Sequence, residues 1–162
     1  MEKAIFLDRD GVINNNENRY YISKPEDLIL NTGIADALKT FQDHNFNLII
    51  ISNQSGISKK IYSKEDCDRV HDRLKKILSG HGINITEIYY CPHHPEVENC
   101  LCRKPESLLF EKALARFNID PAQSWMIGDN DRDVIAAEKA GLRTILINPN
   151  EDIRKYSNLI IG

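Results

Sequence analysis

The stretch "IFLDRDGVIN", residues 5–14, joins an apolar run to two acids that stand one residue apart. Residues 4–7 are all apolar, which is typical of a strand that is buried on both faces. The run ends directly at Asp8, and Asp10 follows after a single arginine. Carboxylates at the end of a buried strand indicate a parallel sheet with a ligand site beyond its carboxyl edge.

The composition indicates a globular protein and argues against several function classes. The chain has 162 residues, 41% of them hydrophobic and 28% charged, which is ordinary for one domain. A net charge of −3 argues against nucleic-acid binding, which normally needs a basic stripe. No apolar run approaches the ~20 residues of a membrane helix, and the N-terminus lacks a signal-peptide pattern. We therefore expect a cytoplasmic, monomeric protein without membrane contact, whose four cysteines do not form structural disulfides.

Short apolar runs alternate along the chain with patterns of helical period. Strands are expected at residues 4–7, 48–51, 88–90, 125–127 and 144–147, with a further edge strand at 159–161. Helices are expected at residues 33–44, 63–78, 108–117 and 133–140, and a loop at 14–18. This alternation predicts an α/β fold, a Rossmann-like parallel sheet in one domain over residues 1–162, with helices on both faces.

Polar residues follow the predicted strands. They are Asp8 and Asp10; Ser52, Asn53, Gln54 and Ser55; Arg103 and Lys104; and Asp129, Asn130, Asp131 and Asp133. Each group alone has an ordinary explanation: a turn, a strand exit, a solvated pair of cations, or acids at a helix N-terminus. Their joint occurrence in chain order is harder to explain as four independent turns than as one site at the sheet edge.

The chemistry of these residues points to phosphoryl transfer. Asp8, Asp10 and Asp129 in one place would repel one another unless a cation intervened, and oxygen ligands suit Mg²⁺. A lysine, a serine hydroxyl and loop amides offer the charge stabilisation that a phosphoryl group needs. One carboxylate can act as nucleophile and form an aspartyl-phosphate, while its neighbour transfers a proton to the leaving oxygen.

With these motifs, Asp8-x-Asp10, Ser52, Lys104 and Gly128-Asp129-x-x-x-Asp133, the chain resembles the haloacid dehalogenase (HAD) superfamily of phosphatases over residues 4–147. Within it the chain is most similar to the D-glycero-D-manno-heptose 1,7-bisphosphate phosphatases, and next to the histidinol-phosphate phosphatases. The stretches "FLDRDGVIN", "SNQSGI", "YYCPHHPE" and "CRKP" carry the narrower similarity. The resemblance implies a fold without a large cap domain.

The resemblance also implies a role for each matching residue. Asp8 would be the nucleophile and Asp10 the general acid and base, and Mg²⁺ would be bound by Asp8, the Asp10 carbonyl and Asp129. Ser52 and Lys104 would hold the transferring phosphoryl group, with Asn53, Gln54 and Ser55 lining the substrate pocket. Arg103 would contact the second end of the substrate, and Asp133 would orient Lys104 or support the metal shell.

Two positions depart from the heptose enzymes. The loop "NNENRYYI" stands where those enzymes usually have a shorter Gly-Tyr-Val element, and we align Tyr21 with that tyrosine. Asn130 stands where some relatives carry a lysine. Both residues are candidates for substrate binding, so the departures bear on substrate choice rather than on phosphatase chemistry.

The stretch "CPHHPEVENCLC" predicts a structural zinc site. Thiolates and an imidazole at this spacing fit a tetrahedral Zn²⁺, with Cys91, His93, Cys100 and Cys102 as ligands. His94 is the alternative histidine, and His93 is preferred because the resembled family has a Cys-x-His pattern. A set of reduced loop cysteines is the alternative to a metal site. This zinc loop, residues 91–102, runs into Arg103 and Lys104, so we hypothesise that it shapes substrate access. Cys67, His44, His71 and His81 fall on or beside helical patterns, where we expect an unreactive thiol and solvated imidazoles.

The sequence thus predicts a Mg²⁺-dependent phosphomonoester hydrolase. The resemblance implies removal of the 7-phosphate of heptose 1,7-bisphosphate in nucleotide-activated heptose synthesis, with a phosphorylated sugar as the only partner. Histidinol phosphate is the alternative substrate, for which Asn16 or Glu17 could lie near the amine. A non-catalytic zinc-containing binding module is the alternative of another class, but it leaves the Asp, Ser and Lys motifs unexplained.

Overall fold

The computed structural model describes residues 1–162 and contains one five-stranded parallel sheet in the order β3-β2-β1-β4-β5. The predicted α/β fold is therefore confirmed. The strands are β1 (Lys3–Leu7), β2 (Phe46–Asn53), β3 (Glu87–Cys91), β4 (Trp125–Gly128) and β5 (Arg143–Leu146). The helices are α1 (Ile34–Asp43), α2 (Lys64–Gly80), α3 (Leu108–Arg116), α4 (Asp131–Lys139) and α5 (Ser157–Ile161), with short 3-10 helices at Pro25–Asp27, Pro121–Gln123 and Ile153–Tyr156.

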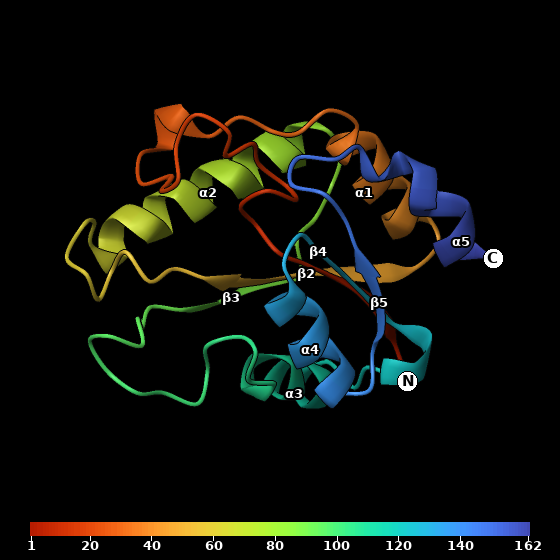
Figure 1. Cartoon of the computed structure of the whole chain (residues 1–162). Helices are drawn as coiled ribbons and strands as arrows, with labels where there is room; N and C mark the ends of the chain where they lie inside the picture. The colour runs from red at the N-terminus through yellow and green to blue at the C-terminus, as the bar shows by residue number, and fades with distance from the viewer.

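The helices form a layer on each face of the sheet. Figure 1 shows α1, α2 and α5 on one face and α3 and α4 on the other, with the sheet seen edge-on between them. Alternate residues of β1 serve the two layers: Ile5 and Leu7 pack toward α1 and α2, and Ala4 and Phe6 toward α3 and α4. Both faces of β1 are buried, which explains why its sequence is continuously apolar.

The order of the strands sets the position of the acids. β1 lies in the centre and pairs with β2 on one side and β4 on the other, with Leu7 opposite both Ile50 and Ile127. Because the three strands end at nearly the same level, the residues that follow them meet at one edge. None of the helices combines the length and apolarity that crossing a membrane requires.

Helix α2 begins with a complete capping box at Ser63. The Ser63 hydroxyl accepts a hydrogen bond from the Asp66 amide at 3.1 Å, and the Asp66 carboxylate accepts one from the Ser63 amide at 2.9 Å. The buried residues of α2 are Cys67, Val70, His71, Leu74 and Leu78. The prediction that His71 is solvated is wrong, because it shares the apolar face with Val70 and Leu74.

Two predicted boundaries also change. Residues 159–161 belong to α5, not to an edge strand, and Ile160 packs into the core beside α1. A run of three apolar residues has no period, so the sequence could not separate helix from strand there. Helix α4 begins at Asp131, two residues earlier than predicted, because the Asn130 side chain caps its first turn.

We expect the Ser63→Ala variant to lower the free energy of unfolding by about 1 kcal/mol, because the capping bond at the start of α2 is lost. Urea unfolding followed by circular dichroism measures the change. Ser79→Ala is the matched control, since Ser79 is exposed near the other end of α2 and its side chain makes no hydrogen bond. Equal losses in the two variants would contradict the capping role.

Candidate active site

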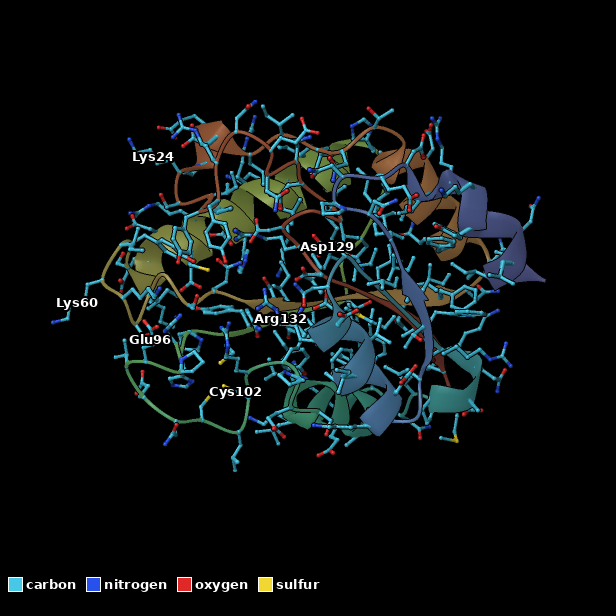
Figure 2. The ribbon with its side chains drawn as sticks, viewed as in Figure 1. Lys24, Lys60, Glu96, Cys102, Asp129 and Arg132 are labelled. Carbon is cyan, nitrogen blue, oxygen red and sulfur yellow. The ribbon has the colours of Figure 1, made fainter.

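A cavity at the carboxyl edge of the sheet collects most of the predicted residues. The predicted residues that line it are Asp8, Asp10, Tyr21, Asn53, Gln54, Ser55, Arg103, Lys104, Asp129 and Asn130. Figure 2 shows Asp129 and Arg132 near the centre of the molecule, beside the start of α4. Ser52 and Asp133 are 1% exposed and do not line the cavity; they lie behind its wall.

Lys104 lies buried among the acids. Its Nζ atom donates hydrogen bonds to Asp8 Oδ1 at 3.0 Å and to the Ile51 carbonyl at 2.8 Å, and it forms an ion pair with Asp133 Oδ1 at 2.6 Å. Two hydrogen bonds and two ion pairs therefore hold the ammonium. Burial opposes the charge, but the Asp133 and Asp8 carboxylates outweigh it and raise the pKa of Lys104. Lys104 is therefore a fixed positive charge at the Asp8 carboxylate.

The floor of the cavity has more negative than positive charge. Four carboxylates, those of Asp8, Asp10, Asp129 and Asp133, lie at or directly behind the floor together with two buried cations, Arg9 and Lys104. Carboxylate oxygens of Asp8, Asp129 and Asp133 lie within 4.8 Å of one another. The excess of two carboxylates matches the charge of one divalent cation.

The pKa values of two of these acids are raised. Burial raises the pKa of Asp8 to about 8, and nearby acids add to this effect while Lys104 opposes it. Burial and the Asp133 charge also raise the pKa of Asp129. An oxygen-only donor set with uncompensated negative charge fits Mg²⁺, and Asp8 and Asp129 are the acids that could hold it in the open cavity.

Gly11 allows the chain to pass close to this pair of acids. Its φ of +84° is in the left-handed region, and a Cβ atom there would clash with the Asp129 carboxylate. The turn after β1 can therefore bring the Asp8 and Asp129 side chains together only with glycine at this position.

Asp10 is held by donors on both carboxylate oxygens. Asn14 Nδ2 donates to Oδ1 at 3.0 Å and Gln54 Nε2 donates to Oδ2 at 3.0 Å. Gln54 Nε2 also donates to the Ser52 hydroxyl at 2.8 Å, and Tyr62 donates to Gln54 Oε1 at 2.6 Å. Gln54, which was predicted as a pocket residue, thus also connects Ser52 to Asp10.

Two more predicted residues support the backbone of the site. Asn53 and Lys104 exchange hydrogen bonds: Asn53 Nδ2 donates to the Lys104 carbonyl at 3.2 Å, and the Lys104 amide donates to Asn53 Oδ1 at 3.1 Å. The side-chain oxygen of Asn130, Oδ1, accepts a hydrogen bond from the Arg132 amide at 3.2 Å. Both residues also line the cavity.

The rim of the cavity carries two arginines and a group of tyrosines. Arg103 donates to the His93 carbonyl at 3.3 Å, and neither Arg103 nor Arg132 forms an ion pair. Tyr21 packs edge-on against Tyr20, with ring centroids 4.7 Å apart, and against Tyr62 at 5.8 Å. The rim thus offers unpaired positive charge and an aromatic wall.

Several of these residues were missed by the sequence analysis. They are Arg9, Asn14, Tyr20, Tyr62 and Arg132. Arg132 stands two residues after Asn130 and carries a cation to the cavity from the first turn of α4. The spacing Asp129-x-x-Arg132 on an expected helix start was the available signal, since both residues could face the same edge.

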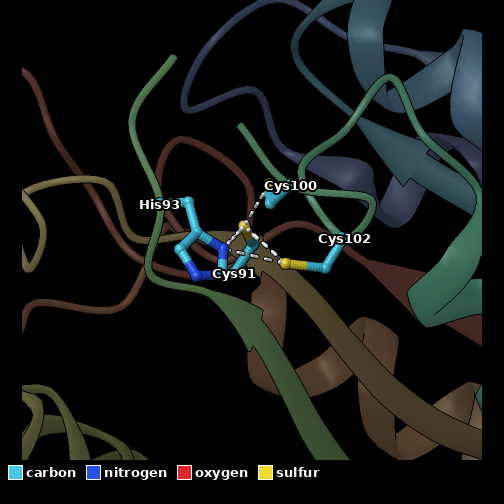
Figure 3. Close-up of side chains that lie close together, drawn as sticks. All are labelled: Cys91, His93, Cys100 and Cys102. Atoms are coloured by element: carbon cyan, nitrogen blue, oxygen red, sulfur yellow. Dashed lines mark hydrogen bonds between the residues drawn. The ribbon is translucent and has the colours of Figure 1, made fainter. Parts of the chain in front are cut away.

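The four predicted zinc ligands come together at the end of β3, as Figure 3 shows. Cys91 Sγ is 2.8 Å from Cys102 Sγ and 3.6 Å from Cys100 Sγ, and His93 Nδ1 is 3.4 and 3.2 Å from the Cys91 and Cys102 sulfurs. Ligands of a tetrahedral zinc lie about 3.5–3.8 Å apart, so the set needs only small adjustments to hold one.

The neighbouring histidine faces elsewhere. His94 Nδ1 accepts a hydrogen bond from the Glu96 amide at 3.1 Å, whereas His93 directs Nδ1 at the sulfurs and Nε2 toward Glu98 at 3.9 Å. The geometry therefore favours His93 over His94 as a ligand. Cys67 lies apart from the cluster in α2, and burial raises the pKa of its thiol to about 11.

Comparisons with known proteins agree with this geometry. The HAD-hydrolase-like family model matches residues 101–154. A D-glycero-beta-D-manno-heptose-1,7-bisphosphate 7-phosphatase of Haemophilus ducreyi is 39% identical, covering 99% of this chain and 93% of that protein. The crystal structure of D,D-heptose 1,7-bisphosphate phosphatase from B. bronchiseptica, complexed with magnesium and phosphate, has a TM-score of 0.84 at 29% identity, covering 96% of this chain and 84% of that one. The histidine biosynthesis bifunctional protein HisB of Legionella pneumophila is 33% identical over 100% of this chain, which spans 46% of that protein.

The parallel sheet without a large cap, the acid cluster at its edge and these relatives define a phosphatase of the haloacid dehalogenase superfamily. Within that superfamily, the chain belongs to the family of the D-glycero-D-manno-heptose-1,7-bisphosphate 7-phosphatases. The predicted resemblance is thereby confirmed. A non-catalytic zinc module does not account for relatives that are phosphatases.

We expect His71 to make the stability of the fold depend on pH. Burial, with the Arg9 charge as a second cause, lowers the pKa of His71 to about 3 from an ordinary value of 6.5. Below pH 6.5 the unfolded chain binds this proton and the folded chain does not, so stability falls as the pH falls. His71 should therefore lower the free energy of unfolding by about 2 kcal/mol between pH 7 and pH 5.

Urea unfolding of the wild type and of His71→Gln at both pH values measures this effect. Glutamine keeps an acceptor but does not titrate, and all other titrating groups are common to the two proteins. The loss between pH 7 and pH 5 should be smaller in the variant by about 2 kcal/mol. Identical losses would show that folding does not lower the pKa of His71.

Proposed function

We propose that the chain is a Mg²⁺-dependent phosphomonoester hydrolase that works through an aspartyl-phosphate on Asp8. Its substrate would be D-glycero-D-manno-heptose 1,7-bisphosphate, from which it removes the 7-phosphate in nucleotide-activated heptose synthesis. The observation that carries the proposal is the Asp8 carboxylate, which lies at the cavity with Lys104 at 3.0 Å and Asp10 two residues away. The names of the relatives support the choice of substrate.

In the first step, an Asp8 oxygen attacks the phosphorus and the bond from phosphorus to the sugar oxygen breaks. The Asp10 carboxyl gives its proton to that leaving oxygen. As the Asp8 carboxylate loses its charge to the new bond, the Lys104 donor that it occupied becomes available to a phosphoryl oxygen. Ser52, whose hydroxyl is held by Gln54, would bind another phosphoryl oxygen.

In the second step, Asp10 takes a proton from the water that attacks the phosphorus. The bond between phosphorus and the Asp8 oxygen then breaks, which releases phosphate and restores the carboxylate. Asp10 therefore changes role between the steps, from acid to base. Asp133 holds Lys104 in place throughout, because their contact of 2.6 Å lies away from the cavity.

Mg²⁺ bound by Asp8, Asp129 and the Asp10 carbonyl would neutralise the excess acid and draw charge from the phosphoryl oxygens. The carboxylate oxygens within 4.8 Å of one another and the raised pKa values of Asp8 and Asp129 support this assignment. The Cys91, His93, Cys100 and Cys102 set would hold a structural Zn²⁺.

The second end of the substrate would meet the rim of the cavity. A bisphosphate needs a cation for the phosphate that does not react, and Arg103 at the rim is free of carboxylate partners. Arg132, in the first turn of α4, also lines the cavity and could share this contact. Histidinol phosphate would instead present a cationic amine to these arginines, which disfavours it.

We further propose that residues 1–162 form one phosphatase domain whose zinc loop, residues 91–102, shapes access to the cavity. The loop runs directly into Arg103 and Lys104, so its conformation fixes both cations. A cytoplasmic location would suit the synthesis of nucleotide-activated sugars. The expected monomer stays a prediction.

The substrate is tested by measuring phosphate release, with Mg²⁺ present, from heptose 1,7-bisphosphate and histidinol phosphate side by side. We expect kcat/KM to be at least ~100-fold higher for the heptose, about 2.7 kcal/mol of transition-state discrimination. The reverse ratio would make the chain a histidinol-phosphate phosphatase. Asp8→Asn is the control and should abolish release from both substrates, because the nucleophile is lost.

The zinc loop is tested with the two adjacent histidines. His93→Ala should lose bound zinc, raise KM and lower kcat while Mg²⁺ still activates the enzyme, because the loop that carries Arg103 and Lys104 loosens. His94→Ala should keep its zinc and its kinetics. Zinc is counted with a chromogenic chelator in each purified variant. Unchanged kinetics in zinc-free protein would contradict the positioning role of the loop.

A further inference from the structure

The arginine between the two acids of the first motif is buried completely. Arg9 has no exposed surface, although it stands between two residues that line the cavity. Its guanidinium contacts Asp10 and reaches His71 of α2. A buried guanidinium is costly unless each donor is paired, so its partners show what it does.

Most of its donors are directed at one carboxylate. Arg9 Nη2 lies 3.0 Å from Asp10 Oδ1 and 3.1 Å from Oδ2, and Arg9 Nε lies 3.2 Å from Oδ1. Nη2 also donates to the Ile22 carbonyl at 3.3 Å. A planar fork of donors fixes both the position and the rotation of a carboxylate, which a single point charge does not.

The third nitrogen, Nη1, connects Arg9 to helix α2. Arg9 Nη1 donates to His71 Nε2 at 3.1 Å, and His71 is 6% exposed. His71 must be neutral to accept this bond, and its lowered pKa agrees with a neutral ring. The His71 ring packs at 5.3 Å from Tyr90 of β3, so the acceptor itself is fixed by the fold.

We infer that Arg9, held by His71, is a positioning residue that fixes the Asp10 carboxyl for both of its proton transfers. The inference rests on the proposed function, in which Asp10 is first an acid and then a base. His71 thereby links a helix 62 positions along the chain to the catalytic acid. Neither Arg9 nor His71 is needed for the attack of Asp8 on phosphorus.

The two catalytic steps depend on Asp10 to different degrees, and kinetics with two leaving groups can separate them. A sugar alkoxide is a poor leaving group unless Asp10 protonates its oxygen. In contrast, p-nitrophenolate is a stable anion and leaves without a proton. Hydrolysis of the aspartyl-phosphate needs Asp10 as base whichever group has left. With p-nitrophenyl phosphate, a misplaced Asp10 should therefore leave the first step fast and make the second step slow.

The experiment compares Arg9→Lys, which keeps the charge but not the fork, with His71→Leu, which removes only the acceptor. We expect both variants to lower kcat for the sugar bisphosphate about 10- to 100-fold, a part of the 10²–10⁴-fold that general acid–base catalysis supplies. With p-nitrophenyl phosphate, stopped-flow absorbance should show a burst of nitrophenolate that approaches one equivalent per active site, followed by slow turnover. His71→Gln, which keeps an acceptor for Arg9, should restore much of the wild-type rate.

Two controls separate positioning from damage to the fold. Val70→Ala removes core volume from the buried face of α2 without touching Arg9, so it should lower stability but show no burst. A variant that is merely part-unfolded loses activity toward both substrates by the same factor and shows no burst. That result for Arg9→Lys and His71→Leu would overturn the inference.

Asp10→Asn separates failure of the inference from failure of the proposed function. If Asp10→Asn gives the burst and the Arg9 and His71 variants do not, Asp10 is the acid and base but does not depend on Arg9. If Asp10→Asn itself gives no burst and loses both substrates equally, the proposed role of Asp10 is wrong, and the inference falls with it.

Discussion

The site depends on the ion pairs that the buried Lys104 ammonium forms with Asp8 and Asp133. An ammonium that is 1% exposed is stable only with every donor paired, and its partners come from the end of β1, the end of β2 and the first turn of α4. These segments are brought together by the parallel order of the central strands. The Lys104 charge therefore stabilises the close approach of these segments, which the strand order makes possible. Loss of any one partner would leave one face of the buried ammonium without a polar contact.

The rest of the cavity floor follows the same rule of mutual pairing. Gln54 joins Asp10 to Ser52, Tyr62 holds Gln54, and Asn53 holds the backbone of Lys104. Side chains that are fixed by one another need little reorganisation when charge develops on a phosphoryl group, which is how preorganised sites gain their effect. The floor still contains more carboxylates than cations. The side chains of the site are thus fixed by one another, and an excess of negative charge remains that fits a divalent cation.

The sequence was most informative where chemistry follows a strand. The apolar runs and the acids after them predicted the sheet and the place of Asp8, Asp10 and Asp129, because a buried strand and its exit are both local patterns. Arg9 could not be predicted in this way, since an arginine in a turn is normally solvated and its partner His71 lies far along the chain. The burial of His71 itself was visible in the spacing of the apolar face of α2, where it falls between Val70 and Leu74. The helix at residues 159–161 gave no such signal, because three apolar residues fit either kind of element.

The segment from Cys91 to Lys104 combines two functions in fourteen consecutive residues. It begins at the end of β3, passes through the four potential zinc ligands, and ends at the buried Lys104. Its start is fixed by the sheet and its end by the ion pairs of Lys104, yet the residues between them form no helix or strand. A loop of this kind is ordered either by its own hydrophobic core or by a cross-link. Val97 and Leu101 are exposed and add no apolar core to the loop, which supports the proposal that a metal in the Cys/His cluster orders it. A zinc ion in this cluster, as we propose, would hold the loop that leads to Arg103 at the rim, although the cluster itself does not line the cavity.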